Sequence, residues 1–197
     1  MVQGSVWAVV CPTALRYYLC EMRSDPDKSR HGEWKRFGCR RIGLISDTHG
    51  LLRKEAVEAL NGSELILHAG DVGDPQILET LRRVAPVLAV RGNIDIEDWG
   101  RELPESEVVE AGGVIFYMLH DVKALDLNPR AAGFQVVVSG HSHKPGRTER
   151  DGVLYINPGS AGPRRFNLPI MIARMDVGRE PWPVEFVDLG KGRTVKA

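Results

Sequence analysis

The sequence predicts an α/β (α+β) fold in which two mixed β-sheets pack face to face and helices lie outside. Strands and helices are expected to alternate over residues 41–93, a pattern typical of parallel strands joined by right-handed crossovers. After Asn93 the chain changes to short apolar runs separated by glycine-containing turns, which is typical of hairpins. A length of 197 residues with 43% hydrophobic residues suits one domain with a substantial core.

The expected strands of residues 41–93 are short and apolar, and each ends in a polar or glycine-containing turn. This pattern is typical of strands buried in a parallel sheet. Asn61-Gly62 ends the first expected helix, and Pro75 suits the first turn of the second. We expect strands at 42–46, 65–68 and 87–90, and helices at 52–60 and 75–84.

The chain after Asn93 is expected to add mainly strands. Ala111-Gly112-Gly113 separates two apolar runs and therefore predicts a hairpin. A short helix is expected over 125–132, although Pro129 opposes it. We expect strands at 108–109, 114–119, 135–139, 153–156, 170–175 and 184–187.

Residues 1–40 lack the periodicity of either helix or strand, and their second half is polar and rich in charge. We expect these residues to form a poorly ordered N-terminal extension and residues 41–197 to form the functional domain. A wrongly assigned start of the coding sequence would give the same pattern.

Charge and cysteine content exclude several classes of protein. Lys+Arg and Asp+Glu are equal at 26 each, so we expect no general nucleic-acid binding, and attraction for an anionic substrate must be local. The three cysteines include no Cys-x-x-Cys pair, which favours reduced thiols and a cytoplasmic location over a disulfide framework. No apolar run approaches the ~20 residues that span a bilayer, and no signal peptide is expected. A homo-oligomer remains open.

Seven potential metal ligands stand in short clusters where expected strands end. Because parallel strands point their carboxyl ends into one crevice, these side chains are expected to converge. Two carboxylates, one amide and four imidazoles suit two adjacent divalent cations that share one carboxylate. The seven residues are Asp47, His49, Asp71, Asn93, His120, His141 and His143.

Two divalent cations outweigh the two carboxylates of Asp47 and Asp71, so the site stays cationic and favours a phosphate oxyanion. Such metals lower the pKa of a bridging water and clamp the phosphoryl oxygens. Oxygen and nitrogen ligands without a thiolate suit manganese, iron, cobalt, nickel or zinc.

Each motif alone is a weak signal, because Gly-Asp and Gly-Asn are common turns and single histidines are often core residues. For four nearby residues, a supporting or surface role is an alternative to direct binding of metal or substrate. His68 is expected to be buried behind the ligands and Asp95 to orient a ligand or a turn. Arg164 and Arg165 could each grip a phosphate oxygen or lie on the surface.

In this order, the motifs Asp-x-His, Gly-Asp, Gly-Asn, His and Gly-His-x-His resemble the calcineurin-like metallophosphoesterase superfamily. Gly-His-Ser-His-Lys-Pro at 140–145 and Asn-Pro-Gly-Ser at 157–160 are most similar to its small YfcE-type phosphodiesterase branch. The resemblance covers residues 41–189 and implies a four-layer αββα sandwich. It further implies a first metal on Asp47, His49, Asp71 and His143, and a second on Asp71, Asn93, His120 and His141.

The chain departs from the family pattern at two positions. Many relatives have a histidine, which is taken to protonate the leaving group, where this chain has Ile94. Relatives commonly have Gly-His where this chain has Asp121-Val122, so the loop that shapes the substrate pocket is expected to differ. We therefore expect leaving groups to depart with little help from an enzymatic acid.

These observations favour a metal-dependent phosphoesterase, and within that class a phosphodiesterase. The nucleophile is expected to be a hydroxide that bridges two divalent ions, with manganese favoured. Asp71, Asn93 and His120 are expected to act in catalysis through that hydroxide and by positioning the phosphate. The alternatives are a phosphomonoesterase or nucleotidase on the same centre, a single-metal hydrolase of another class, and a non-catalytic protein-binding scaffold such as the retromer subunit of this fold.

Overall fold

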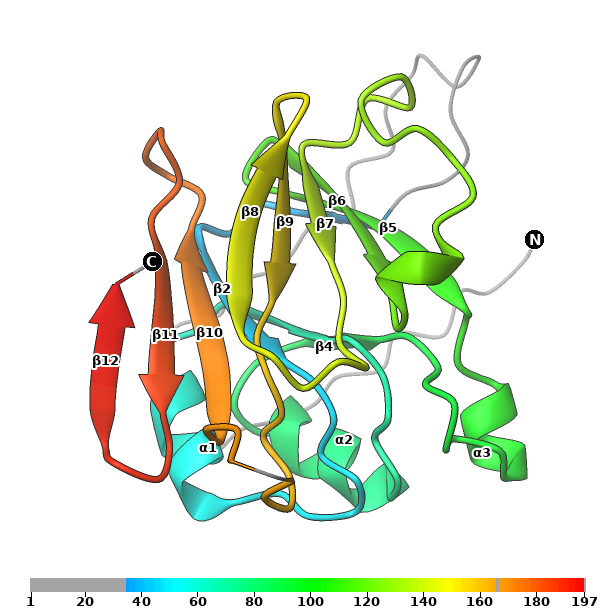
Figure 1. The fold of residues 1–197 in the computed structure, drawn as a ribbon, viewed down its shortest axis with the longest axis vertical. Helices are drawn as coiled ribbons and strands as arrows, with labels where there is room; N and C mark the ends of the chain where they lie inside the picture. The colour runs from blue at the N-terminus through cyan, green and yellow to red at the C-terminus, as the bar shows by residue number, and fades with distance from the viewer. Residues whose placement is uncertain (1–34, 166, 197) are drawn as a thin grey trace, which may run out of the picture.

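The computed structural model describes residues 35–165 and 167–196, in which the strands form two six-stranded mixed sheets (Figure 1). The strands are β1 (Lys35–Phe37), β2 (Arg41–Ile45), β3 (Leu65–His68), β4 (Val87–Ala89), β5 (Ser106–Ala111), β6 (Val114–Leu119), β7 (Val136–Val138), β8 (Gly146–Arg150), β9 (Val153–Asn157), β10 (Met171–Asp176), β11 (Val184–Asp188) and β12 (Arg193–Lys196). The helices are α1 (Lys54–Leu60), α2 (Pro75–Arg82), α3 (Asp98–Arg101) and the 3₁₀ turn η1 (Val122–Ala124).

The first sheet has the order β12-β11-β10-β2-β3-β4. Strands β2, β3 and β4 are parallel, with Ile42 opposite Leu65 and Ile66 opposite Val87. Helices α1 and α2 form the crossovers between them, as the alternating pattern predicted. Strands β10, β11 and β12 extend the sheet in antiparallel fashion.

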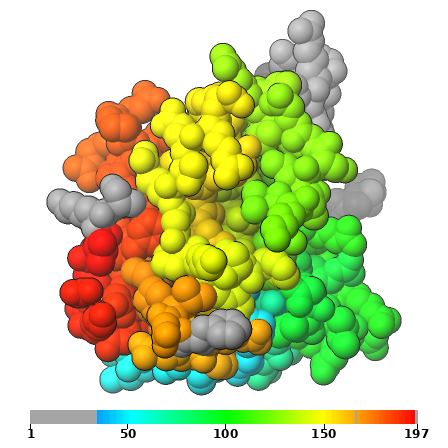
Figure 2. Space-filling model, in the orientation of Figure 1, coloured from blue at the N-terminus to red at the C-terminus, as the bar shows by residue number. Residues whose placement is uncertain are grey.

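The second sheet has the order β1-β5-β6-β7-β9-β8. The predicted hairpin is present as the antiparallel pair β5 and β6, and β6, β7 and β9 are parallel neighbours. Strand β8 closes one edge against β9. Strands β8 and β9, in yellow, occupy the middle of the face seen in Figure 2.

The main core lies between the two sheets. Apolar residues at alternate positions of each sheet point into it, and most are fully buried, which gives the period-two pattern of packed sheets. They include Ile42, Leu44, Leu65, Leu67, Met171 and Ala173 from one sheet and Val109, Phe116, Met118, Val136, Val138 and Ile156 from the other.

The two outer faces are covered differently. Helices α1 and α2 lie on the first sheet, where Leu60 and Leu81 pack against Ile45, Ile66 and Ile172. On the outer face of the second sheet, Leu119, Val137 and Val153 pack with partly buried side chains such as Leu125. In the described residues this layer is the connection between β6 and β7, which contains η1.

The predicted fold class, two mixed sheets packed face to face with outer helices, is confirmed. The helix expected over 125–132 was wrong, and the stretch consists of bends and turns. Pro129 supplies no N–H, Asn128 bonds the Ala131 N–H through its side chain, and Gly133 reverses the chain at a φ of 81°. Five elements were not expected, namely β1, α3, η1, β8 and β12.

The expected extension of residues 1–40 falls largely on residues 1–34, which lie outside the described residues. Lys35–Phe37 form β1, which pairs in parallel with β5, so the described sheet begins before Arg41. No helix in the described ranges combines the length and apolar character needed to cross a bilayer.

Candidate metal centre

The seven predicted ligands follow the carboxyl ends of five strands from both sheets. Asp47 and His49 follow β2, Asp71 follows β3, and Asn93 follows β4. In the other sheet, His120 follows β6, and His141 and His143 follow β7. The Gly140 N–H donates to the His120 carbonyl at 2.9 Å, which holds the last two loops together. The structure brings all seven side chains to this one edge of the sandwich.

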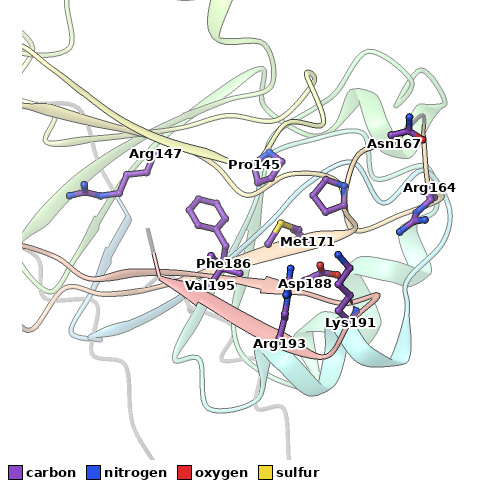
Figure 3. Close-up of a pocket in the computed structure, with 11 residues that line it drawn as sticks. Pro145, Arg147, Arg164, Asn167, Met171, Phe186, Asp188, Lys191, Arg193 and Val195 are labelled. Carbon is purple, nitrogen blue, oxygen red and sulfur yellow. Dashed lines mark hydrogen bonds between the residues drawn. The ribbon is translucent and has the colours of Figure 1, made fainter.

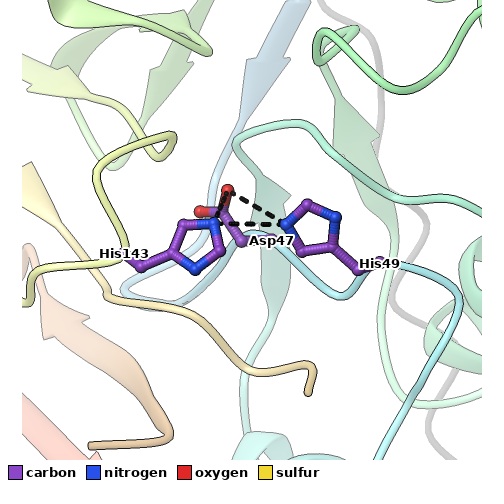
Figure 4. A group of neighbouring side chains, drawn as sticks. All are labelled: Asp47, His49 and His143. Carbon is purple, nitrogen blue, oxygen red and sulfur yellow. Dashed lines mark hydrogen bonds and ion pairs between the residues drawn. The ribbon is translucent and has the colours of Figure 1, made fainter. Parts of the chain in front are cut away.

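One group consists of Asp47, His49 and His143 (Figure 4). Nε2 of His143 lies 3.2 Å from Oδ1 of Asp47 and 3.2 Å from Nε2 of His49. Nε2 of His49 lies 3.9 Å from the same Asp47 oxygen. One potential ligand atom from each residue therefore faces a common point, which is the arrangement that a metal ion requires.

A second group consists of Asp47, Asp71 and His120. Oδ2 of Asp71 lies 3.3 Å from Nε2 of His120 and 3.6 Å from Nε2 of His49, so this carboxylate stands between the two groups. Asn93 extends the second group, because its Oδ1 lies 3.0 Å from Nε2 of His120 and 3.1 Å from Nδ1 of His141.

The centre is buried on one side and open on the other. Asp47, Asp71, His120 and His143 are buried, whereas Asn93 and His141 are exposed. The two exposed side chains therefore border the side through which a ligand can enter.

The backbone of the ligand loops is strained. Asp47, His49, Asp71, His141 and His143 have φ values of 54°, 47°, 54°, 64° and 58°, in the left-handed region that side chains with a Cβ disfavour. Such residues cost of order 1–3 kcal/mol each and persist only where the surroundings hold them. Here the holding groups include backbone bonds between loops, from the Asp47 N–H to Gly70 O at 3.0 Å and from the His49 N–H to Asp71 O at 2.9 Å.

Asp95 joins the loop after β3 to the loop after β4. Its buried carboxylate accepts the N–H groups of Gly92 at 2.8 Å, Gly73 at 2.9 Å and Val72 at 3.2 Å. The close approach also explains Gly92, because a Cβ there would overlap the backbone N of Asp71. Asp95 is thus a loop-orienting residue and belongs to neither ligand group.

His68 lies behind the centre and contacts the loop that carries Asp47 and His49. The Thr48 hydroxyl donates to Val72 O at 2.9 Å, so its oxygen accepts from Nε2 of His68 at 3.0 Å. Burial lowers the pKa of His68 to about 4, which keeps the ring neutral at neutral pH. His68 therefore supports the ligand loop without joining the ligands.

The protonation states suit cation binding. Burial and the neighbouring His49 and Arg165 lower the pKa of His143 to about 4, so its nitrogen keeps a free electron pair. Burial alone would raise the pKa of Asp71, but hydrogen bonds from His120 and the Ile94 amide outweigh it and lower that pKa. Nδ1 of His120 faces Ala69 O at 2.7 Å, which directs Nε2 toward the centre.

Asp47 provides the sharpest test of whether a metal fits. Burial raises its pKa to about 6, and one oxygen, Oδ2, accepts from Ser46 Oγ at 2.6 Å and from the His141 N–H at 3.2 Å. The other oxygen, Oδ1, is buried and has no hydrogen-bond partner among the described residues. Because a buried carboxylate oxygen without a partner is costly, a divalent cation beside the two histidine nitrogens fits this position.

Several contacts of the centre were not predicted from the sequence. Oδ2 of Asp121 lies 3.7 Å from Nε2 of His141, and Asn157 donates to Gly140 O at 2.6 Å. Nη2 of Arg165 lies 3.5 Å from Nδ1 of His49, so this exposed side chain reaches the edge of the centre. The Asn-Pro-Gly-Ser motif was the available signal for Asn157, whereas Asp121 had none besides its place after a ligand.

Known protein families and solved structures resemble this chain in sequence and in fold. The family model described as the calcineurin-like phosphoesterase superfamily domain matches residues 41–180. A probable metallophosphoesterase of Methanothermobacter thermautotrophicus is 35% identical over 148 residues, which cover 68% of this chain and 86% of that protein.

Two solved structures share the fold at lower identity. A Vps29 mutant from Entamoeba histolytica has a TM-score of 0.66 and 21% identity, covering 80% of this chain and 99% of its own. YfcE, a phosphoesterase from E. coli, has a TM-score of 0.62 and 22% identity, covering 80% and 98%. On its sequence and its fold, this chain belongs to the calcineurin-like phosphoesterase superfamily.

Proposed function

We propose that this protein is a metal-dependent phosphodiesterase with a dinuclear centre, carried by residues 41–197. The observation that supports this most is the place of Asp71, whose Oδ2 lies within 3.6 Å of a nitrogen from both His49 and His120. A carboxylate between two sets of nitrogen and oxygen ligands suits a bridging role. The membership in a phosphoesterase family supports the reaction class.

In this proposal each of two divalent ions has its own ligand set. Asp47, His49, Asp71 and His143 hold the first, and Asp71, Asn93, His120 and His141 hold the second. Manganese is favoured, with iron, cobalt, nickel or zinc as alternatives, because the ligands include no thiolate. When bound, the ions supply a nucleophilic hydroxide at neutral pH and neutralise charge on the phosphoryl oxygens.

The protein's own groups orient the substrate. Asn93 and His141 border the open side, and the Arg165 guanidinium beside His49 offers a fixed positive charge to a phosphate oxygen. Ser160 is not a nucleophile in this proposal, because its hydroxyl donates to Asp47 O at 2.9 Å and is buried. No covalent intermediate is expected. A cytoplasmic location is also proposed, because the three cysteines include no Cys-x-x-Cys pair.

The direct test compares a diester with a monoester on the purified full chain. With manganese we expect kcat/KM for bis(4-nitrophenyl) phosphate to exceed that for 4-nitrophenyl phosphate by about tenfold or more. EDTA is expected to abolish turnover and manganese to restore it. A preference for the monoester would favour the nucleotidase, and two bound metals without turnover of either ester would favour the scaffold.

Ile94 predicts a strong dependence of rate on the leaving group. The Ile94 side chain has no acidic proton to donate to a leaving group, and it is partly exposed beside Asn93. Its backbone N–H donates to Oδ1 of Asp71 at 3.0 Å. We expect turnover of a phosphodiester series to fall steeply from nitrophenol to alkyl leaving groups. Ile94→His is expected to raise turnover of the poorest leaving groups by up to about 10²-fold. Similar turnover rates for all leaving groups in the unaltered protein would contradict the absence of a general acid.

A further inference from the structure

A groove of about 630 Å³ lies between β8, at the edge of one sheet, and β11 and β12, at the edge of the other (Figure 3). Strand β8 and the loop 164–169 form one wall, and β11, β12 and the turn between them form the other. Figure 3 shows Arg147 at one end of the groove and Arg164 at the other. The lining residues are Pro145, Arg147, Arg164, Asn167, Pro169, Met171, Phe186, Asp188, Lys191, Arg193 and Val195.

The charge on this groove is unbalanced. Arg147, Arg164, Lys191 and Arg193 are exposed, and none forms an ion pair with another residue in the described ranges. The lining contains one acid, Asp188, which is 5% exposed and whose Oδ1 accepts the N–H groups of Gly190 and Lys191. Its charge is thus largely used within the turn, and the rim presents a local excess of positive charge on a chain of zero net charge.

The floor of the groove is apolar. Met171 and Phe186 are buried at 6% exposure, and Pro145, Pro169 and Val195 complete the surface. An apolar floor with a cationic rim suits a ligand that has a flat organic body and an anionic group at its end. Arg164, Lys191 and Arg193 lie toward one end of the groove, and Arg147 lies at the other (Figure 3). An added Cβ at Gly190, next to Lys191, would lie 3.9 Å from Nη2 of Arg164.

Two short segments connect the groove to the metal centre. Pro145 stands two residues after His143. Arg164 directly precedes Arg165, and consecutive Cα atoms are about 3.8 Å apart. Since the Arg165 guanidinium reaches His49, the two adjacent arginines serve the centre and the groove respectively. A substrate held at the proposed metal centre would therefore lie close to one end of the groove.

We propose that this groove binds the distal part of the substrate, and that this part carries a second phosphate group. The ligand class is a nucleotide-like phosphodiester whose base or sugar rests on the apolar floor and whose second phosphate meets Arg164, Lys191 and Arg193. This assignment rests on the proposed function and narrows its substrate. It also gives the local attraction that a chain without net charge requires for an anionic substrate.

A matched pair of substrates tests the proposal. Thymidine 5′-(4-nitrophenyl phosphate) and its 3′-phosphorylated form differ by one phosphate and release the same nitrophenolate. We expect kcat/KM to be about tenfold or more higher for the 3′-phosphorylated form with the unaltered protein. In the double variant Arg164→Ala/Arg193→Ala this ratio is expected to fall to about 1–2, while Arg164→Lys/Arg193→Lys keeps part of it. Arg130→Ala, an exposed cation outside the groove, serves as the matched control and should leave the ratio intact.

The result that overturns the proposal is a ratio near one in the unaltered protein, or a high ratio that the double variant leaves unchanged. A binding measurement separates this failure from failure of the proposed function. Thymidine 3′,5′-bisphosphate is titrated calorimetrically into metal-free Asp71→Ala, with and without the two arginine substitutions. Binding that the arginine substitutions weaken about tenfold supports the groove even if no ester is hydrolysed, and binding that they leave unchanged refutes it.

Discussion

Asp71→Ala is expected to lower turnover of bis(4-nitrophenyl) phosphate by about 10³-fold or more, equivalent to about 4 kcal/mol of transition-state stabilisation. The carboxylate stands between His49 and His120, at 3.6 and 3.3 Å. Alanine removes the shared ligand from both proposed metal positions at once. We therefore expect the variant to retain less than two equivalents of manganese after dialysis, measured by inductively coupled plasma mass spectrometry.

Two controls separate the loss of a ligand from a disturbed loop. Asp71→Asn keeps an oxygen that can accept the Ile94 N–H but removes the charge, so it should fold normally and still lose most turnover. Asp98→Ala removes a fully exposed carboxylate on α3 and should behave like the unaltered protein. An Asp71→Ala protein with full activity and two bound ions would refute the bridging role.

Asp95→Ala is expected to destabilise the protein by about 3–5 kcal/mol. Three N–H groups, those of Val72, Gly73 and Gly92, lose the acceptor that joins two loops, and the first and last of these bonds are buried. The loss should be seen in urea unfolding of metal-free protein, because none of these contacts involves a metal ligand. With manganese present, the affinity for the metal should fall as well, since the loops carry Asp71 and Asn93.

Asp95→Asn provides the graded comparison. Its side chain retains one acceptor oxygen but turns an NH₂ group toward backbone donors, so we expect a smaller loss of about 1–3 kcal/mol. Asp126→Ala, at an exposed position of the 121–134 loop, should change the free energy of unfolding by no more than about 0.5 kcal/mol. If the free energy of unfolding of Asp95→Ala were within about 1 kcal/mol of that of the unaltered protein, other groups would have to hold the two loops together.

Much of this architecture could be predicted because local signals agree with the global fold. Apolar runs such as 42–46 and 65–68 are read directly as buried strands, and the parallel order places their ends together. The ligands are recognisable by residue type and by their position after those runs. The left-handed backbone at Asp47 and His49 could not be predicted, because it is held by their N–H bonds to Gly70 O and Asp71 O of another loop.

The elements that escaped prediction lack an apolar pattern of their own. Every residue of β8 is exposed, so the strand has no hydrophobic alternation and is defined by its pairing with β9 alone. α3 is a single turn of four residues. The groove is assembled from β8, the loop 164–169 and the β11–β12 turn, and no sequence pattern relates these segments. The two neighbouring arginines could not be told apart in the sequence, yet Arg165 faces His49 and Arg164 lines the groove.

The division between residues that could coordinate an ion and residues that hold the loops has an evolutionary consequence. Asp95, Thr48 and the crossing backbone amides keep the geometry of this edge, and none of them needs to touch a metal. Replacing a few side chains at the tips of the loops would abolish catalytic activity and leave the fold intact. A lineage with this architecture can therefore exchange hydrolysis for protein recruitment through a small number of substitutions, without first rebuilding its interior.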